Sequence, residues 1–558
     1  MNVYKGKNMS RAATILTFTG FILLLMTSCD LTSELRESPP HIMTADNLYQ
    51  DRGGFELAIN GLYSRTRGEF TKEDNGGGVT SFNQGTDCCT SNHPAGYMIT
   101  NTLRDFGATL GTTNEFVNLT YSWLYNVINI ANNIIQRAEN EDSPLTQDEA
   151  TIVLADAKAV RAWAYRHLTY LFGDVPLTLE PASGENIRTD WTRTPINEVR
   201  QQMIEDWQFA QQHLPVNATM QGRMTKGAVQ HYLAETYLAI GEDQEALQWV
   251  DEVINEPQYE LITERYGDRA DQPGVPYMDM FREANVDREN GNTEALWVFQ
   301  YQFGVTGGDN YRVVSRRVTQ SRYGVIRRDG VVPLQYTVER GGRGLARASV
   351  TKWLLELFED GDDRGSNHAI RQYFILKDAD ENDTGVADNP PPGWAFGDTL
   401  WTDDSGDITV DNNNRTDWPF SRKFDWAIPE NPTIPQSYHN HLYLRLADTY
   451  LLKAEAQHNI GDNAGAAATI NIVRSRSNAS PISAADIDIN FILDERAREL
   501  VWEEHRRHTL VRTGKFLERT RLYNHNGGQN VEDKHALWPI PQDVIDANVE
   551  PIEQNPGY

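Results

Sequence analysis

Residues 124–172 read LYNVINIANNIIQRAENEDSPLTQDEATIVLADAKAVRAWAYRHLTYLF and contain the pattern that decides the fold. Apolar residues recur three and four positions apart in both halves of this stretch, which is the spacing of an amphipathic helix. They are Leu124, Val127, Ile128, Ala131, Ile134, Ile135 and Ala138, and then Val153, Ala157, Val160, Ala164, Leu168 and Leu171. Residues 140–146 between the halves include Ser143-Pro144, a turn signal. The stretch therefore predicts two antiparallel helices joined by a tight turn.

The same helical spacing returns along much of the chain. It covers residues 196–213, 226–240, 243–255, 442–460, 463–477 and 490–510. Alanines stand where neighbouring helices would cross closely, at Ala131, Ala157, Ala164, Ala234, Ala447 and Ala454. Repeated helix pairs with small residues at their crossings predict a mainly α fold of tetratricopeptide-like helical pairs.

Two stretches lack this periodicity, residues 71–107 and about 259–440. They are rich in Gly, Asp, Asn, Pro and aromatic residues, with short β-prone pieces at 296–299 and 331–338. Long irregular segments within a compact domain usually carry function. We therefore expect one domain, residues 41–558. Its helical scaffold would cover about 41–258 and 441–558, and a large loop-rich, short-strand insertion at about 259–440 would bind the ligand.

The N-terminus has the order of regions found in an export signal. Lys5, Lys7 and Arg11 precede an apolar run over residues 12–26, and Thr27-Ser28-Cys29 follows. The run is shorter than the roughly 20 residues of a permanent membrane span. The residues before Cys29 look like a bacterial lipobox, which predicts a lipoprotein signal peptide over residues 1–28 and a lipidated, flexible tether over 29–40. The alternative is an ordinary secretory signal with a chance cysteine.

The composition excludes several classes of protein. The formal net charge is −28, and removal of residues 1–28 would take three basic residues and no acidic one. Such a surface repels nucleic acid and anionic lipid. Beyond Cys29 the only cysteines are Cys88 and Cys89, too few for a disulfide framework or a zinc site. A disulfide between neighbours is strained, so two free thiols are expected.

Charged residues at helical spacing allow two interpretations. Arg445, Asp448 and Glu455 share one predicted helix face, and Arg496, Glu499, Glu503 and Arg507 share another. Two of these carboxylates could act as the acid and base of a glycosidase, which needs an open cleft. We favour an ion-pair network between helices, because these residues lie in the regular scaffold. His505 and His508 lack the zincin order and are expected to lie at the surface or to pack between helices.

No cofactor is predicted. The acidic runs 378–383 and 403–407 contain the oxygen ligands that calcium prefers, but neither matches the register of an EF-hand. A solvated acidic turn is the favoured interpretation, and a structural calcium ion stays an open alternative.

A set of short motifs carries a family resemblance. In chain order they are Arg161-Ala-Trp-Ala-Tyr165 with Tyr170-Leu-Phe-Gly-Asp-Val-Pro176, Gly222-Arg-Met-Thr225, Leu444-Arg445-Leu-Ala-Asp448, Asn471-Ile-Val-Arg474, Glu495-Arg496-Ala-Arg498-Glu499-Leu500, Trp538-Pro-Ile-Pro541 and Gln554-Asn-Pro-Gly-Tyr558. With the lipobox, this order resembles the SusD/RagB family of bacterial outer-membrane lipoproteins.

The resemblance implies a function as well as a fold. It implies a SusD-like α-α superhelix, anchored by lipid in the outer membrane and facing the cell exterior. Such a protein captures oligo- or polysaccharide without altering it and delivers it to a SusC-like TonB-dependent transporter. The alternative cargo is oligopeptide, captured by the same lid mechanism as in RagB. Two further classes are weighed: a glycosidase, and a protein-interaction solenoid that binds no small ligand.

Aromatic residues gather in the irregular segments, at Tyr97, Trp191, Tyr301, Tyr311, Tyr323, Trp394, Trp401, Trp418 and Trp426. Sugar rings stack on aromatic faces while polar side chains satisfy their hydroxyls. By the resemblance, the predicted ligand-binding residues are Asn83, Asp87 and Tyr97 from the first irregular stretch, with Tyr323, Trp394 and Trp418 from the second.

The second stretch also contains a basic island in an otherwise acidic chain. It consists of Arg312, Arg316, Arg317, Arg322, Arg327 and Arg328. Arginine forks bind carboxylate or sulfate through paired hydrogen bonds, so the island could select an acidic polysaccharide. Pairing with nearby acidic residues of the same chain is the other interpretation.

Overall fold

The computed structural model describes residues 45–71, 82–91, 102–103, 106, 110–182, 188–305, 307–308, 313–402 and 416–558. The chain divides into two compact units, residues 1–55 and 56–558. α2 (Ala45–Leu48) belongs to the first unit, and α3 (Arg52–Thr66) begins in it and continues into the second. Everything below concerns the second unit, which also includes α4 (Gly68–Thr71).

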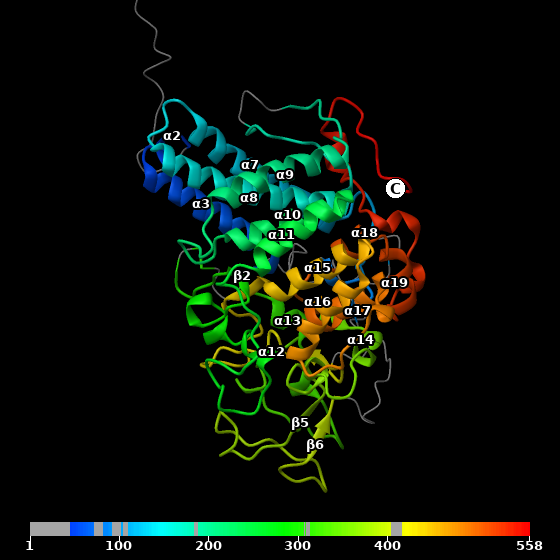
Figure 1. The fold of residues 1–558 in the computed structure, drawn as a ribbon. Coiled ribbons are helices and arrows are strands. Elements are labelled where there is room, and N and C mark those ends of the chain that lie inside the picture. Colours follow the sequence, from blue (N-terminus) through cyan, green and yellow to red (C-terminus); the bar gives the residue numbers. More distant parts are fainter. Residues whose placement is uncertain are drawn as a thin grey trace, which may run out of the picture. The chain divides into compact units, whose positions relative to one another are not determined.

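The scaffold helices pack in chain order. α7 (Glu115–Glu139), α8 (Gln147–Phe172), α9 (Ile196–His213), α10 (Lys226–Ile240) and α11 (Asp243–Ile254) each contact the next helix along the chain. α11 then contacts α15 (Leu446–Asn459), which packs on α16 (Asn463–Arg476) and α17 (Ile489–Leu500), so the stack resumes after the insertion (Figure 1). The predicted fold of tetratricopeptide-like helical pairs is confirmed.

Capping residues fix the ends of these helices. The Asn114 side chain accepts from the Val117 amide at 3.2 Å at the start of α7. Thr146 and Glu149 form a capping box at the start of α8. α10 ends at Gly241, whose φ of 80° lies in the left-handed region that other residues adopt only at a cost. The predicted crossing alanines are fully buried, which lets the helix backbones approach closely.

Two buried strands join the insertion to the scaffold. β2 (Ala295–Phe299) pairs antiparallel with β8 (His441–Arg445). Tyr443 of β8 stacks on Phe299 at 4.2 Å between ring centroids, and its hydroxyl accepts from Trp163 Nε1 of α8 at 3.0 Å. The predicted strand at 296–299 is therefore correct. The predicted helix at 442–460 starts only at Leu446, because the residues before it pair with β2.

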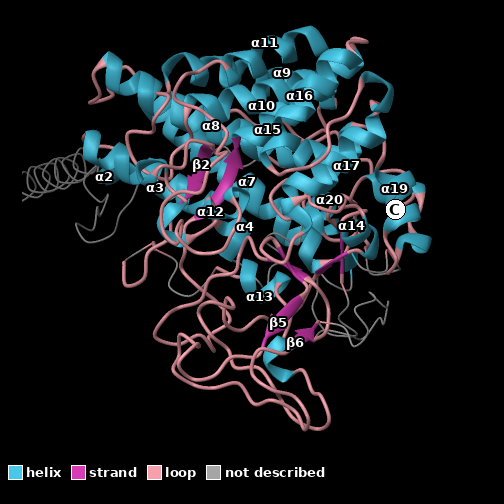
Figure 2. Ribbon diagram, turned by 60° about the horizontal axis from the view of Figure 1, so that its bottom comes forward, coloured by secondary structure: helices cyan, strands magenta, loops and turns pink. Residues whose placement is uncertain are grey.

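The insertion is built from short elements around its own core (Figure 2). β4 (Ile370–Arg371) pairs with β7 (Phe420–Ser421), and β5 (Tyr373–Ile375) pairs with β6 (Thr399–Trp401). Its helical elements are α12 (Pro276–Asp279), η1 (Glu283–Asn285), η2 (Arg288–Asn290), α13 (Ser315–Thr319), η3 (Tyr323–Val325), α14 (Lys352–Glu356) and η4 (Asp363–Gly365). The β-prone residues 331–338 form only an isolated bridge between Arg328 and Val331, so the strand predicted there is wrong.

The C-terminal part closes the scaffold. It contains η5 (Ala484–Asp486), α18 (Arg506–Arg512), α19 (Phe516–Tyr523), η6 (Gly528–Asn530), η7 (Asp533–Ala536) and α20 (Gln542–Asp546). The single helix predicted over 490–510 is interrupted between α17 and α18, where Trp502 has a φ of 65°. Trp538 is buried against Phe116 and Phe172, and its amide donates to the Leu171 carbonyl at 2.6 Å. No helix among the described residues is long and apolar enough to cross a membrane.

Candidate functional site

Residues 82–91, here called the anchored segment, are fixed by a buried carboxylate. Asp87 Oδ1 accepts from Arg506 Nε at 2.8 Å, and Oδ2 accepts from an Arg506 terminal nitrogen and from Arg519 Nε, both at 2.7 Å. Burial alone would raise the pKa of Asp87, but the two guanidinium groups outweigh it and hold the pKa at about 2. The carboxylate is therefore charged and fully paired.

Backbone contacts reinforce the anchored segment from two other parts of the chain. β1 (Cys89–Thr90) pairs antiparallel with β3 (Ser349–Val350). Thr351 Oγ1 donates to the Asp87 carbonyl at 2.6 Å, and Asn524 Nδ2 donates to the Thr86 carbonyl at 2.6 Å. Segments from the start, middle and end of the chain thus meet in one rigid base on the loop-rich side.

The structure buries most of the predicted ligand-binding side chains. Asn83, Asp87, Tyr323 and Trp418 are all buried. Tyr323 belongs to the core of the insertion, and Trp418 Nε1 donates to the Val350 carbonyl at 2.9 Å. These side chains hold loops together and do not offer a surface to a ligand, so we correct their role from binding to packing.

The remaining predicted site residues have different positions. Trp394 is half-buried and packs against the core of the insertion, so it keeps part of its ring at the surface. Tyr97 and the predicted lipidation site Cys29 lie outside the described residues. Both therefore stay predictions.

A different pair of rings lies beside the anchored segment and is half-exposed. Trp353 of α14 and Tyr523 of α19 stack with centroids 4.4 Å apart and ring planes 22° apart. The guanidinium of Arg519, which also binds Asp87, lies 5.0 Å from each ring centre. The Trp353–Tyr523 pair, here called the aromatic platform, is therefore held in place by the same residue that fixes the base, and both rings keep part of their area at the surface.

A second accessible pair lies on the β5–β6 hairpin. Tyr373 and Trp401 are cross-strand partners with centroids 5.0 Å apart, and Trp401 is 42% exposed. Leu400 and Phe374 point into the core from the same strands. Sequence reasoning named Trp401 among the irregular-segment aromatics but missed Tyr373, Trp353 and Tyr523. The run Tyr373-Phe374-Ile375 has no apolar–polar alternation, so the sequence gives no signal that Tyr373 faces outward.

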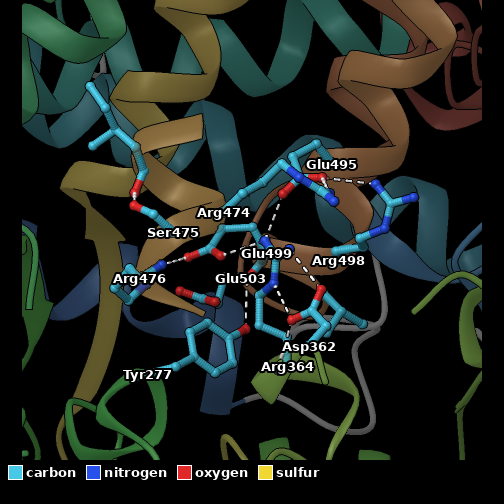
Figure 3. A network of polar contacts seen from close by, with 12 residues as sticks. Tyr277, Asp362, Arg364, Arg474, Ser475, Arg476, Glu495, Arg498, Glu499 and Glu503 are labelled. Carbon is cyan, nitrogen blue, oxygen red and sulfur yellow. Dashed lines mark hydrogen bonds and ion pairs between the residues drawn. The ribbon is translucent and has the colours of Figure 1, made fainter. Parts of the chain in front are cut away.

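The carboxylates considered for glycosidase chemistry are locked in ion pairs, and Figure 3 shows those around Glu499. Glu499 accepts from Arg445 at 2.7 Å, from Arg364 at 3.1 Å and from Arg476. Burial opposes ionisation of Glu499, but these arginines hold its pKa well below the usual range. Both Glu499 and its partners are buried, so the predicted structural network is confirmed around Glu499. Arg507, also predicted to belong to it, instead donates to the His535 carbonyl at 2.6 Å. Arg445 joins it from the end of β8, not from the helix face expected.

Three buried histidines lie close together behind the anchored segment. Nitrogen atoms of His167, His505 and His508 lie within 4.8 Å of one another. His167 Nδ1 and His508 Nε2 are 2.9 Å apart, while Arg166 donates to His505 Nδ1 at 2.8 Å. His505 Nε2 therefore carries the proton that it donates to Glu69 at 2.9 Å. Both nitrogens of His505 are used and a guanidinium faces it, so the cluster packs helices together, as predicted.

The cysteines and one acidic run also have structural surroundings. Cys88 and Cys89 are free and buried, as predicted, and burial raises the pKa of both thiols. In the acidic run 378–383, Asp383 accepts from the amides of Val338 and Glu339 at 3.2 Å and 2.5 Å. That carboxylate thus stabilises a turn. The acidic run 403–407 lies outside the described residues.

The arginines of the basic island differ in burial and in their partners. Arg316 is buried and donates to backbone carbonyls, including that of Gln436 at 3.0 Å. Arg328 pairs with Asp417 at 3.6 Å. Arg322 stays half-exposed with Nε unpaired among the described residues, whereas Arg327 is exposed. Arg312 lies outside the described residues.

A cavity of about 1100 Å³ lies in the helical half, away from the anchored segment. Its walls come from α7, residues 176–182, residues 188 and 191, and the region of α20, and include Tyr125, Asn129, Trp191 and Asp543. Arg188 already covers the Trp191 ring at 4.4 Å, and Asn118 already binds Asp543 at 2.6 Å. Much of its polar and aromatic surface is therefore engaged within the chain.

The fold and this site define a helical-repeat protein with a loop-rich face that bears accessible aromatic rings and a buried, fully paired set of charges. Two family models match the chain, one described as "SusD family" over residues 293–558 and one described as "Starch-binding associating with outer membrane" over residues 82–238. The chain belongs to the SusD/RagB family.

Individual relatives are distant, and most of those named here match over more than nine-tenths of the chain. "SusD-like protein P25" of Formosa agariphila is 25% identical, covering 96% of this chain and 98% of its own. "Starch-binding protein SusD" of Bacteroides thetaiotaomicron is 35% identical over 118 residues, 20% of this chain and 21% of its own. Among solved structures, a "Laminarin binding SusD-like protein" is 22% identical, with a TM-score of 0.67 and coverage of 91% of this chain and 100% of that one. "Surface glycan-binding protein A from Bacteroides fluxus" is 18% identical with a TM-score of 0.64, covering 91% and 99%.

Proposed function

We propose that this protein is a carbohydrate-binding lipoprotein of the outer membrane. It is attached through Cys29, captures oligo- or polysaccharide on the loop-rich side, and delivers it unaltered to a SusC-like TonB-dependent transporter. Membership of the SusD/RagB family supports this proposal, as do the similar proteins that are named for binding starch, laminarin or surface glycan.

The observation that carries the proposal is the Trp353–Tyr523 pair. The two half-exposed rings are nearly parallel, and Arg519 ties them to the anchored segment. An aromatic face binds the C–H face of a sugar ring without any reactive group. The carboxylates that a glycosidase would need are instead buried in ion pairs within the described scaffold.

Affinity electrophoresis of residues 30–558 in gels that contain neutral or acidic polysaccharides tests the proposal. We expect at least one polysaccharide to retard the protein, with no shortened products in a parallel incubation. Release of products would contradict a capture role. Failure of every polysaccharide, combined with binding of oligopeptides, would favour the RagB-like alternative.

A matched pair of variants tests the aromatic platform itself. Trp353→Ala removes one ring of the pair, whereas Leu522→Ala removes an exposed apolar side chain, 67% accessible, from the neighbouring position on α19. We expect Trp353→Ala to weaken retardation about tenfold, in line with the loss of one stacking contact, and Leu522→Ala to leave it unchanged. Equal effects of the two substitutions would place the glycan elsewhere.

A further inference from the structure

A two-stranded ladder in the helical half stops after one pair of residues. Val175 and Thr194 form an isolated antiparallel bridge, with N···O distances of 3.3 Å and 3.0 Å. In a regular antiparallel ladder the next hydrogen-bonded pair would be Leu177 with Thr192. No backbone hydrogen bond joins those two residues in the part of the chain that the structure describes, so the two segments separate there.

The segment that diverges from residues 177–181 is paired with the end of the chain instead. The Asn548 side chain accepts from the Trp191 amide at 2.9 Å and donates to the Trp191 carbonyl at 2.8 Å. The Val549 amide donates to the Thr189 carbonyl at 2.6 Å. The C-terminal residues, red in Figure 1, therefore take the backbone groups with which residues 177–181 would otherwise pair.

One backbone edge of that segment stays open as a result. On the opposite edge, the Thr178 amide donates to the Tyr165 hydroxyl at 2.7 Å, and the Thr178 carbonyl accepts from Asn132 Nδ2 at 2.9 Å. Successive residues of an extended chain point to opposite sides, so the backbone groups of Leu177 and Leu179 point away from these partners. The Leu177 carbonyl and both backbone groups of Leu179 form no hydrogen bond with any described residue.

The open edge lines the cavity of about 1100 Å³. Leu177, Leu179 and Pro181 all contribute to its wall. Its rim is apolar, since Leu179 is 41% exposed and Val549, next to the wall residue Asn548, is 77% exposed. An unpaired backbone edge beside accessible apolar side chains is a surface to which another strand can add.

A polypeptide fits this cavity better than a sugar does. Polar side chains of the wall already have partners, because Asn118 donates to Asp543 and Arg188 pairs with Asp190 at 2.8 Å. A sugar depends on such side chains, whereas an added strand needs backbone donors and acceptors at alternate residues. The Leu179 amide and carbonyl would pair with one residue of that strand, and the Leu177 carbonyl would accept from another.

The charges at the rim indicate which polypeptide fits. Glu180 and Asp543 are both exposed, and Glu180 forms no ion pair with a described residue. A basic side chain would complement them. A free oligopeptide also has a terminal carboxylate, but the cation among the described wall residues, Arg188, is already paired with Asp190. The occupant is therefore a segment within a longer chain.

We propose that this cavity binds an extended segment of a partner protein, which adds as an antiparallel strand to residues 177–181. The segment has apolar side chains at alternate positions and a basic residue that faces Glu180. The cavity is separate from the anchored segment, so the proposal is independent of carbohydrate capture.

Hydrogen exchange at the Leu179 amide tests the proposal on residues 30–558. The probes are a library of heptapeptides with acetylated and amidated ends, in which threonine alternates with valine, leucine, isoleucine, phenylalanine or tyrosine between terminal lysines. We expect the Leu179 amide to exchange rapidly in the free protein and about tenfold more slowly with at least one of these peptides. Methylation of the peptide's backbone nitrogens should abolish this protection, because it removes the donors and keeps the side chains. Replacement of the lysines by glutamate should weaken binding several-fold.

Variants locate the bound peptide. Leu179→Pro removes the open amide without taking a hydrogen bond from the chain, so it should lower the affinity of the selected peptide about tenfold in calorimetry. It should leave retardation by polysaccharide unchanged. Glu180→Lys should weaken binding of the lysine-ended peptide several-fold. Glu141→Lys, at an exposed residue just beyond α7, is the charge-matched control and should have no effect.

Three results would overturn the proposal. The first is unchanged exchange at Leu179 with every peptide of the library. The second is tighter binding of the same peptides with free charged ends, which would indicate oligopeptide cargo. The third is protection of residues 177–182 by a polysaccharide, which would make the cavity a glycan site. Exchange in the wild-type protein decides the matter even if Leu179→Pro does not fold, and polysaccharide gels test carbohydrate capture separately.

Discussion

The guanidinium of Arg506 holds the carboxylate of Asp87 through hydrogen bonds of 2.8 Å and 2.7 Å, although the two residues are 419 positions apart in the chain. Asp87→Asn keeps the shape of this side chain but leaves Arg506 and Arg519 buried without their counter-charge. Loss of one partner from a buried pair costs roughly 3–5 kcal/mol. We expect Asp87→Asn to lower the free energy of unfolding by about that amount in urea titrations, whereas Asp533→Asn, at an exposed surface pair, should change it by less than about 0.5 kcal/mol.

Glu499→Gln should show that the central ion pairs are structural. This substitution leaves Arg364, Arg445 and Arg476 facing a neutral amide in a buried site. We expect a loss of roughly 3–5 kcal/mol in stability and no change in the affinity for polysaccharide at temperatures where the variant is folded. A selective loss of activity with unchanged stability would instead indicate a catalytic carboxylate. Glu356→Gln, at the exposed pair with Lys352, is the control.

We expect the free energy of unfolding to decrease as the pH is lowered, in two separate pH ranges. Burial lowers the pKa of His231, His525 and His535 to about 4. Between pH 6.5 and 4 these histidines are therefore protonated in the unfolded chain but not in the folded chain, which lowers the free energy of unfolding as the pH falls. Asp156, whose pKa burial raises to about 6, acts in the opposite direction, but three histidines outweigh it. From about pH 4 toward pH 2 the loss continues as the low pKa of Asp87 is approached. Urea unfolding across this pH range measures both slopes, and a flat profile between pH 6.5 and 4 would contradict the upper range.

The two neighbouring thiols should be unreactive until the protein unfolds. Cys88 and Cys89 are buried, and burial raises the pKa of both, so little thiolate is present near neutral pH. In residues 30–558 they are the only cysteines, which makes a thiol count unambiguous. We expect a chromogenic disulfide reagent to detect almost no thiol in the native protein and both thiols in denaturant. Rapid labelling of the native protein would mean that the anchored segment opens.

The hairpin rings offer a test of how far the ligand extends. Trp401→Ala removes the exposed member of the cross-strand pair with Tyr373, and Val386→Ala removes an exposed apolar side chain elsewhere in the insertion. If long polysaccharides reach the hairpin, Trp401→Ala should weaken their binding several-fold while leaving that of short oligosaccharides unchanged. Titration with a length series by calorimetry distinguishes the two, and an equal effect of Val386→Ala would exclude a specific role for Trp401.

The sequence predicts the scaffold well because its signals are local. The spacing of Val153, Ala157 and Val160 fixes a helix face whatever lies elsewhere in the chain. The irregular segments have no such period, so nothing near Tyr323 or Trp418 in sequence shows that these rings point inward. The sequence around Asp87 also gives no sign of its structural role, because its ion-pair partners Arg506 and Arg519 come from α18 and α19. Trp353 and Tyr523 come into contact only when α14, α19 and the anchored segment pack together.

The position of the anchored segment also dictates an order of assembly. The chain is synthesised from its N-terminus, and α7 to α11 can pack as soon as their own residues are available. Asp87, by contrast, can form its ion pairs only after Arg506 and Arg519 near the C-terminus have been synthesised. The Thr86 carbonyl likewise has its hydrogen-bond donor only after Asn524 has been synthesised. The anchored segment is therefore expected to become organised after α7 to α11, and a chain cut short before residue 506 would lack both arginines that hold Asp87.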